Sequence, residues 1–222
     1  MSSATLLVEM KTLIKELWRH SLIVDATDPI IIQNPGNVRL ITWATWRSHT
    51  APFYVSARLD EYSYHAENRN YSILLFDQSI VQISYGIRKG DVVFHRLYFC
   101  PCPIQYTEDE LQHYGSISEM IRNLDADDLR ERLRLESSIR FDFDPNAASS
   151  FHPAAHLTVL RPTCRVPVFA PLSIGHFIRF VFLHFYREQW EAHQFIREWP
   201  YKNWPRTIQR NDRKHLHFEC AV

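Results

Sequence analysis

Apolar residues recur at helical spacing in two parts of the chain. Residues 4–20 place their apolar side chains on one helical face and their charged side chains elsewhere. Residues 174–187 follow Ser173, a typical N-cap residue, and consist mainly of Phe, Ile, Val, Leu and Tyr. The two patterns predict an N-terminal helix with one buried face and an aromatic helix that is buried on most sides.

Runs rich in β-branched and aromatic residues lie between and after these two helices, and each predicts a strand. The predicted strands cover residues 38–44, 53–59, 71–76, 80–87, 92–100, 137–144, 155–160, 165–169 and 214–219. The consecutive strands form a meander, in which antiparallel pairing is expected. A hairpin loop is expected at residues 86–91, and turns at residues 28–36.

Short helices are predicted between the two groups of strands, over residues 108–113, 117–124 and 127–135. Thr107 and Ser116 each begin a capping-box pattern, with Glu three residues later. The chain is therefore predicted to form a single α+β domain over its full length. Its mainly antiparallel sheet would be packed by the N-terminal helix and by the buried aromatic helix.

Composition narrows the classes of function. The 25 basic and 25 acidic side chains give a formal net charge of zero, so no global field attracts a polyanion. Only five Gly are present and no Gly-rich phosphate-binding motif occurs, which argues against the common nucleotide-binding loops. Neither the serine-hydrolase motif G-x-S-x-G nor the metalloprotease motif H-E-x-x-H is found.

The chain is expected to be cytoplasmic. Its first residues lack the basic and apolar regions of a signal peptide. Its four Cys are then interpreted as free thiols in a reducing compartment. No apolar run has the length of a membrane span, so no membrane association is expected.

The first candidate site lies in the second group of strands. Arg140, Asp142 and Asp144 alternate with three apolar residues, and His152 and His156 follow a short loop later. Because successive side chains of a strand point to opposite faces, one guanidinium and two carboxylates should share one face. Such a group suits a divalent metal, or a general base beside an electrostatic stabiliser. It also suits a salt-bridged structural corner.

A second candidate site is His215, His217 and Glu219, which would share one face of the last predicted strand. His-x-His on a strand can present two imidazoles to one metal ion, but a half-exposed terminal strand has the same pattern. If this strand lay beside the strand of Asp142, the two groups would form one pocket.

Two further features combine cations with aromatic rings. Arg179 belongs to a polar stripe on the aromatic helix, where it would pair with carboxylates or contact a nucleic-acid phosphate. Residues 190–214 interleave Trp and Tyr with Arg and Lys. This pattern fits single-stranded nucleic acid, and it fits a protein interface equally well. The Trp-rich part, residues 190–206, is the predicted protein-binding surface.

Residues 137–187 also carry a series of motifs in a fixed order: R-F-D-F-D-P, H-P-A-A-H-L, C-R-V-P-V and an aromatic helix that ends in F-Y. The series resembles an uncharacterised bacterial family, a domain of unknown function with R-F-D-F-D-P, H-P-x-x-H and C-R-V-P-V blocks. That family is loosely associated with phage-defence and toxin–antitoxin loci, and the match covers about a quarter of the chain. The residues at its motif positions are Arg140, Asp142, Asp144, His152, His156 and Arg165.

The resemblance and the residues together suggest a bacterial defence or toxin-like enzyme that acts on RNA or DNA, with a ribonuclease as the leading hypothesis. In it, His152 or His156 is the general base, and the carboxylates of Asp142 and Asp144 orient that base or hold a divalent metal. Arg140 and Arg165 would bind the scissile phosphate. Two alternatives stay open: a non-catalytic protein-interaction module of a defence or toxin–antitoxin system, and a metal-dependent hydrolase of a small molecule.

Overall fold

A computed structural model describes residues 2–46, 59–134, 136–159, 161 and 163–219. In chain order its elements are α1 (Ser3–Arg19), β1 (Ile23–Ala26), β2 (Pro29–Asn34), the 3-10 turn η1 (Pro35–Asn37), β3 (Val38–Trp43), α2 (Leu59–Glu67), β4 (Ile73–Leu75), β5 (Ile80–Arg88), β6 (Asp91–Cys100), α3 (Glu108–Tyr114), α4 (Ile117–Asn123), α5 (Ala126–Arg132), β7 (Ile139–Phe143), η2 (Pro145–Ala147), β8 (Ala155–Val159), β9 (Arg165–Pro167), α6 (Ile174–Phe185), α7 (Arg187–Ala192), α8 (Gln194–Arg197) and η3 (Asp212–Lys214).

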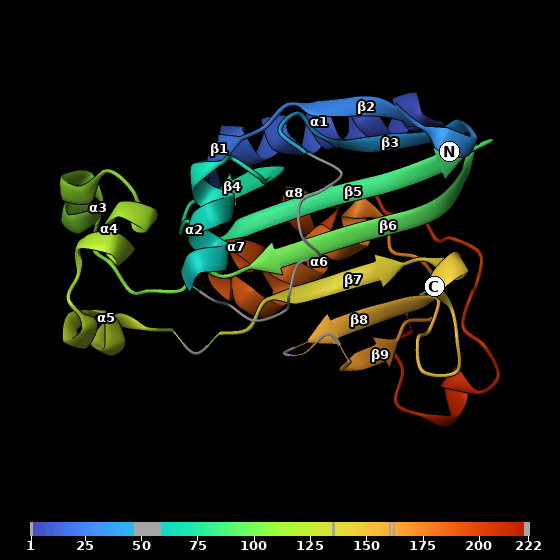
Figure 1. Ribbon diagram of the computed structural model, residues 1–222. Helices are drawn as coiled ribbons and strands as arrows, with labels where there is room; N and C mark the ends of the chain where they lie inside the picture. Colours follow the sequence, from blue (N-terminus) through green and yellow to red (C-terminus); the bar gives the residue numbers. More distant parts are fainter. Residues whose placement is uncertain (1, 47–58, 135, 160, 162, 220–222) are drawn as a thin grey trace.

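Over the described residues, nine strands form one antiparallel sheet (Figure 1). β5 to β9 follow one another as a meander, so each of these strands pairs with the next along the chain. The other edge of β5 is shared: β4 pairs with its beginning, and β3 pairs with its end. Short connections bring β5 next to β6 and β8 next to β9. The connection from β6 to β7 is longer and contains α3, α4 and α5.

One face of the sheet carries the main core. α1, α6 and α8 lie behind the sheet in Figure 1, and their apolar side chains pack against it. Leu13 of α1 and both Phe177 and Phe182 of α6 are almost completely buried. Burying one such side chain contributes about 1.5–3 kcal/mol, so this α-on-β layer supplies most of the hydrophobic stabilisation. The α+β prediction, with both of its packing helices, is confirmed.

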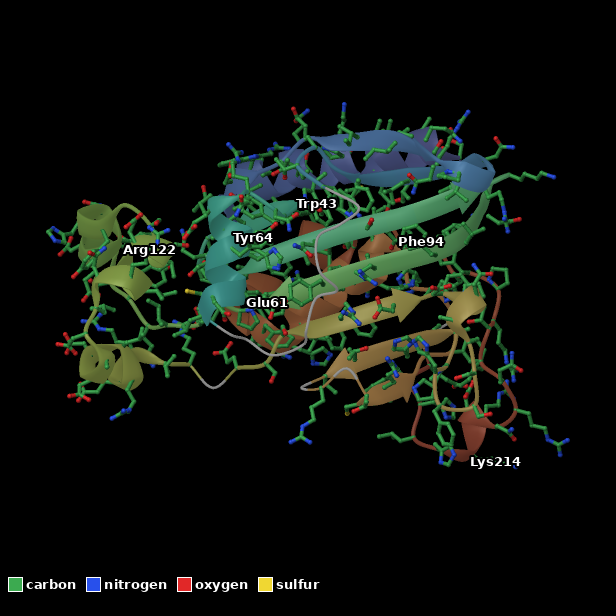
Figure 2. All side chains as sticks on the ribbon, viewed as in Figure 1. Trp43, Glu61, Tyr64, Phe94, Arg122 and Lys214 are labelled. Atoms are coloured by element: carbon green, nitrogen blue, oxygen red, sulfur yellow. The ribbon has the colours of Figure 1, made fainter. Side chains whose placement is uncertain are left out.

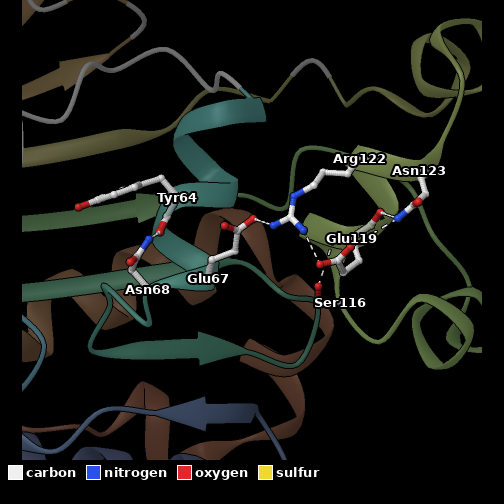
Figure 3. Close-up of polar contacts among 7 residues, drawn as sticks. All are labelled: Tyr64, Glu67, Asn68, Ser116, Glu119, Arg122 and Asn123. Carbon is white, nitrogen blue, oxygen red and sulfur yellow. Dashed lines mark hydrogen bonds and ion pairs between the residues drawn. The ribbon is translucent and has the colours of Figure 1, made fainter.

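A second, smaller core lies at one end of the sheet. It joins α2 and α4 to buried side chains of β5 and β6, including Ile80 and Tyr98. Figure 3 shows how Arg122 of α4 connects the two helices, since its guanidinium binds both Glu67 of α2 and Glu119 of its own helix. α3, α4 and α5 therefore form a helical group beside the end of the sheet rather than a layer over it (Figure 1).

Local sequence signals explain several element ends. Thr107 forms a complete capping box with Glu110 at the start of α3, as predicted. Ser116 and Ser173 accept backbone N–H groups at the starts of α4 and α6. The β5–β6 hairpin turns at Lys89 and Gly90, which both have positive φ, as this type of two-residue turn requires.

Some predictions were incomplete or wrong. β1 and β2 were missed because the turn residues around positions 28–36 masked two short strands, and α2 was missed as well. The strand predicted over residues 53–59 lies outside the described residues, apart from Leu59, which begins α2. The strand predicted over residues 214–219 is wrong: this segment forms η3 and then a single parallel bridge between Phe218 and Val168.

None of the helices in the described part of the chain has both the length and the apolar character of a membrane-spanning helix.

The close packing of β5 against β6 depends on a glycine. A Cβ atom at Gly86 would lie 2.2 Å from Cδ1 of Phe94, so the aromatic ring occupies the space that any side chain would need. Phe94 lies on the face of the sheet turned toward the viewer in Figure 2, away from α6. The face of the sheet toward α6 is covered by helices, whereas Phe94 lies on the opposite face. That opposite face also carries the polar residues described below.

Glu9 of α1 generates a first prediction, because burial raises the pKa of its carboxyl to about 7. The folded state then binds a proton that the unfolded state releases, so stability falls as pH rises from about 4.5 to about 7. Glu9→Gln should raise the free energy of unfolding at pH 8 by roughly 1–2 kcal/mol, allowing for partial solvent screening, and change it little at pH 5. Urea unfolding at both pH values measures this. Glu16→Gln is the matched control on the same helix. An equal increase in the free energy of unfolding at pH 8 in both variants would contradict a raised pKa of Glu9.

Three buried histidines generate a second prediction. Burial lowers the pKa of His65, His95 and His156 to about 4 in each case. Below about pH 6.5 the unfolded chain takes up protons on these imidazoles, whereas the folded protein does not. Protonation therefore favours the unfolded state, and the free energy of unfolding decreases as pH falls from 6.5 toward 4. The free energy of unfolding should drop by several kcal/mol between pH 7 and pH 4.5. Urea unfolding at several pH values in this range measures the change. A free energy of unfolding that stays constant from pH 7 to pH 4.5 would contradict this prediction.

Candidate functional site

The candidate residues are brought together by strand register. One row across the sheet contains Arg96 of β6, Asp142 of β7 and His156 of β8 as direct neighbours. Directly paired residues of adjacent antiparallel strands have Cβ atoms about 4.5–5.5 Å apart, close enough for their side chains to interact. The next row contains Tyr98, Arg140, Thr158 and Arg165 on β6 to β9.

These two rows lie on the face away from α6. Phe141, between Arg140 and Asp142, points the other way into the main core. The predicted alternation of β7 is therefore confirmed for this strand. We use the name charged cluster for the polar residues of this face and the nearby loop: Arg96, Arg140, Asp142, His152, His156 and Arg165.

Asp142 is the only carboxylate of the charged cluster, and it is 8% exposed. Its two oxygens accept hydrogen bonds from Arg140 Nε at 2.5 Å and from Arg96 Nε at 3.2 Å. Burial opposes its ionisation, but the charges of Arg140 and Arg96 outweigh burial and hold its pKa below the usual range. Asp142 is therefore ionised at neutral pH. Arg165 of β9 is in the next row and adds a third guanidinium to the charged cluster, which thus contains three guanidiniums and one carboxylate.

His156 is buried in a defined tautomer. Its Nδ1 lies 2.8 Å from the carbonyl oxygen of Pro153, which can only accept, so Nδ1 carries the proton. Its Nε2 is then the basic nitrogen, 3.6 Å from Asp142 Oδ2. Burial lowers the imidazole pKa to about 4, although the charge of Asp142 acts in the opposite direction. The neutral ring can thus accept a proton at Nε2, and Asp142 would stabilise the resulting imidazolium.

His152 connects the charged cluster to a cavity. Its ring packs edge-on against that of His156, with ring centroids 4.8 Å apart. Burial and the charge of Arg165 lower its pKa. A cavity of about 230 Å³ lies beside it and is lined by hydrogen-bonding groups from two loops, including Ser149, Gln209 and Asn211. The cavity gives a polar molecule access to this end of the charged cluster.

Two predicted residues are not members of the charged cluster. Asp144 accepts backbone N–H groups of Asn146 and Ala147 and caps η2, so it reaches the cluster only through its electrostatic effect on His152. Arg179 lies on α6, across the sheet from Asp142, where its guanidinium stacks over Tyr201. The strand pattern alone could not exclude Asp144 from the charged cluster, because the strand ends at Phe143. It could not exclude Arg179 either, because the face of the sheet that α6 covers is a tertiary feature.

The predicted terminal metal group is not assembled. His215 and Glu219 are exposed, and His217 Nδ1 lies near the backbone carbonyl of His215. The segment lies beyond β9 rather than beside β7; Lys214, which precedes it, is labelled below β9 in Figure 2. Within the described ranges, no group of three or more Cys, His, Asp or Glu side chains has the geometry of a metal site. The condition for joining the two candidate sites, that the last segment lie beside β7, is therefore not met.

The predicted Trp-rich surface is also different in the structure. Trp199 and Trp204 are 7% and 8% exposed, and Trp199 belongs to the main core. Two tryptophans of the predicted protein-binding surface, residues 190–206, are thus interior side chains. Large apolar rings next to short helices are more stable packed on α6 and α1 than in water.

Arg96 is the main residue that sequence reasoning missed. A charged residue inside the apolar strand pattern of residues 92–100 was a signal, but only the pairing of β6 with β7 identifies its partner. Ser149, Gln209 and Asn211 carried no signal, because loops distant in sequence form their cavity.

Comparison with known proteins gives one match. A family model described as "Uncharacterized conserved protein (DUF2290)" matches residues 22–220. No curated protein and no solved structure is significantly similar to the chain. The matched region contains the whole sheet and the charged cluster. The chain therefore belongs to the DUF2290 family of uncharacterized conserved proteins.

Proposed function

We propose that the charged cluster binds the phosphate of an RNA chain and cleaves the adjacent phosphodiester bond. The observation that supports this most strongly is the grouping of Arg96, Arg140 and Arg165 on adjacent strands of one face, where Arg96 and Arg140 contact the carboxylate of Asp142. Guanidinium charge beside the imidazoles of His152 and His156 is what a phosphodiester anion would neutralise. A defence or toxin role, suggested by the family resemblance, would use such an activity.

Each member of the charged cluster has a distinct part in the proposed reaction. Arg96 and Arg165 bind the non-bridging phosphate oxygens, while Arg140 holds Asp142 in place. The ribose 2′-hydroxyl gives its proton to Nε2 of His156 and attacks phosphorus. Asp142 stabilises the imidazolium, and the guanidiniums stabilise the charge that develops on the phosphate. The protonated form of His152 gives its proton to the departing 5′ oxygen and returns to the neutral form, and a 2′,3′-cyclic phosphate is formed.

The choice of RNA follows from the cavity beside His152. Its amide and hydroxyl groups suit the hydroxyls of ribose and the edges of bases, and DNA lacks the 2′-hydroxyl that the reaction needs. The guanidiniums supply the positive charge that a metal ion would otherwise provide. Cleavage is therefore expected to continue in EDTA.

Asp142 is a poor residue for the first test. Removing it would leave the buried guanidinium of Arg140 without its carboxylate, which costs about 3–5 kcal/mol of stability for a buried pair. Loss of activity in that variant would not separate chemistry from unfolding. His152 is half-buried and Arg165 lies at the edge of the sheet, so both can be changed with less structural cost.

The third prediction concerns these two residues. His152→Ala should lower the cleavage rate of a labelled single-stranded RNA about 100-fold or more, the usual contribution of a general acid or base. Arg165→Gln should lower kcat/KM by about 10–100-fold, because it removes a charge from the transition state. Both should keep the melting temperature within a few degrees of wild type.

The matched controls are His113→Ala and Arg161→Gln, which change exposed residues of the same types outside the charged cluster. Their activity should stay within twofold of wild type. DNA of the same sequence should be intact, and EDTA should have little effect. If wild-type protein leaves RNA intact with and without Mn²⁺, or if the controls lose as much activity as the site variants, the proposal fails.

The fourth prediction uses the low pKa of His156, about 4 in the free protein. Because kcat/KM reports the ionisation of free enzyme, the base form of His156 should be available from pH 8 down to about pH 5. An exposed imidazole would instead lose about tenfold of its basic form by pH 5.5. A decrease of kcat/KM toward acid pH that is centred near pH 6.5 would assign the base to another group.

A further inference from the structure

A second cavity lies on the opposite side of the sheet from the charged cluster. It has a volume of about 400 Å³ and is enclosed by α6, by the β7 and β9 side of the sheet and by the C-terminal segment. Most of its wall is apolar, with the rings of Phe141, Phe180, Trp190, Tyr201 and Phe218. This size and lining are typical of sites for small organic molecules.

Two backbone features hold the C-terminal segment in place around this cavity. Gly175 of α6 allows a close approach, since a Cβ atom there would lie 2.2 Å from the carbonyl oxygen of Pro200. This approach brings Tyr201 against α6. Phe218 is held by two backbone hydrogen bonds, to Pro167 at 2.9 Å and from Phe169 at 2.8 Å. The cavity wall is therefore built by tertiary contacts and is formed without a ligand.

His176 presents an N–H group without an acceptor. The hydroxyl oxygen of Ser173 already accepts the backbone N–H groups of His176 and Lys202, so the hydroxyl donates to His176 Nδ1, 3.0 Å away. The proton of the neutral ring is then on Nε2. This atom is buried and has no hydrogen-bond partner among the described residues. Burial and the charge of Arg179 lower the pKa of His176, so the ring is neutral.

Arg179 adds a cation beside this donor. Its guanidinium lies over the ring of Tyr201, 4.9 Å from the centroid, and 6.0 Å from that of Trp190. These cation–π contacts orient the guanidinium, but they leave its N–H groups in the ring plane free for an acceptor. No ion pair of Arg179 is found within the described part of the chain.

The mouth of the cavity carries charge of the opposite sign. Glu219 lines it and is exposed, as is the imidazole of His184. An exposed carboxylate is solvated and needs no partner, but it would repel a second anionic group on a ligand. The cavity thus combines the guanidinium of Arg179, a large apolar wall and the carboxylate of Glu219.

We propose that this cavity binds a small monocarboxylic acid with an aromatic or branched apolar body, whose carboxylate is held by Arg179. A carboxylate is planar and accepts two parallel hydrogen bonds, which matches the guanidinium fork of Arg179. The apolar body of the ligand replaces water against the aromatic wall. This site is separate from the charged cluster and does not depend on RNA cleavage.

The fifth prediction is tested by calorimetric titration of the whole protein with 3-phenylpropionate and with 3-phenylpropionamide, its neutral analogue. The acid should bind at least tenfold more tightly than the amide, because the amide offers no charge to Arg179. This comparison uses wild-type protein only, so it does not depend on whether a variant folds. Equal affinities, or no heat with either compound, would overturn the proposal.

Variants locate the binding residues. Arg179→Gln should weaken binding of the acid at least tenfold and leave binding of the amide nearly unchanged. Arg187→Gln is the matched control, since Arg187 is exposed and paired with Glu191 outside the cavity. Phenylsuccinate, which carries a second carboxylate, should bind Glu219→Gln more tightly than wild type. An unchanged affinity of the acid for Arg179→Gln would place the site elsewhere.

Discussion

An ionised carboxylate in the middle of a buried sheet constrains the strands around it. Asp142 is compensated only where β6 places Arg96 beside it and where β7 itself supplies Arg140. A shift of β7 by one residue would turn Asp142 toward Phe177 and the other apolar side chains of α6. Burial of the apolar face and pairing of the charged face therefore require the same register. Each reinforces the other across β6, β7 and β8.

The same constraint accounts for the chemistry of that face. Because two guanidiniums neutralise one carboxylate and Arg165 adds a third, the sheet presents positive charge next to histidines that burial keeps neutral. A buried ion pair by itself is weak evidence for function, since many serve structure. Here the surplus charge and the adjoining polar cavity distinguish the cluster from a closed salt bridge. The guanidiniums favour an anionic ligand, and the cavity, which Asp212 also lines, favours polar uncharged groups of that ligand.

The sheet also separates two kinds of site. On one side, the charged cluster combines guanidiniums with imidazoles and a polar cavity. On the other, α6 and the C-terminal segment border an apolar cavity that contains the guanidinium of Arg179. The polar stripe of α6 explains the difference: His176 and Arg179 lie on an otherwise apolar helix and find rings rather than carboxylates as neighbours. Neither site uses residues of the other, so each can be tested alone.

The sequence by itself determined the strand and helix faces. The alternation in residues 139–143 identified the core side and the charged side of β7, and the capping residues Thr107, Ser116 and Ser173 located helix starts. These signals are local, because a strand repeats every two residues and a cap acts within three. Only the tertiary structure decided that Arg96 joins Asp142, that Arg179 lies across the sheet, and that Trp199 is interior. Those outcomes depend on which strands pair and which face a helix covers, and pairing between distant segments leaves no periodic pattern in a single chain.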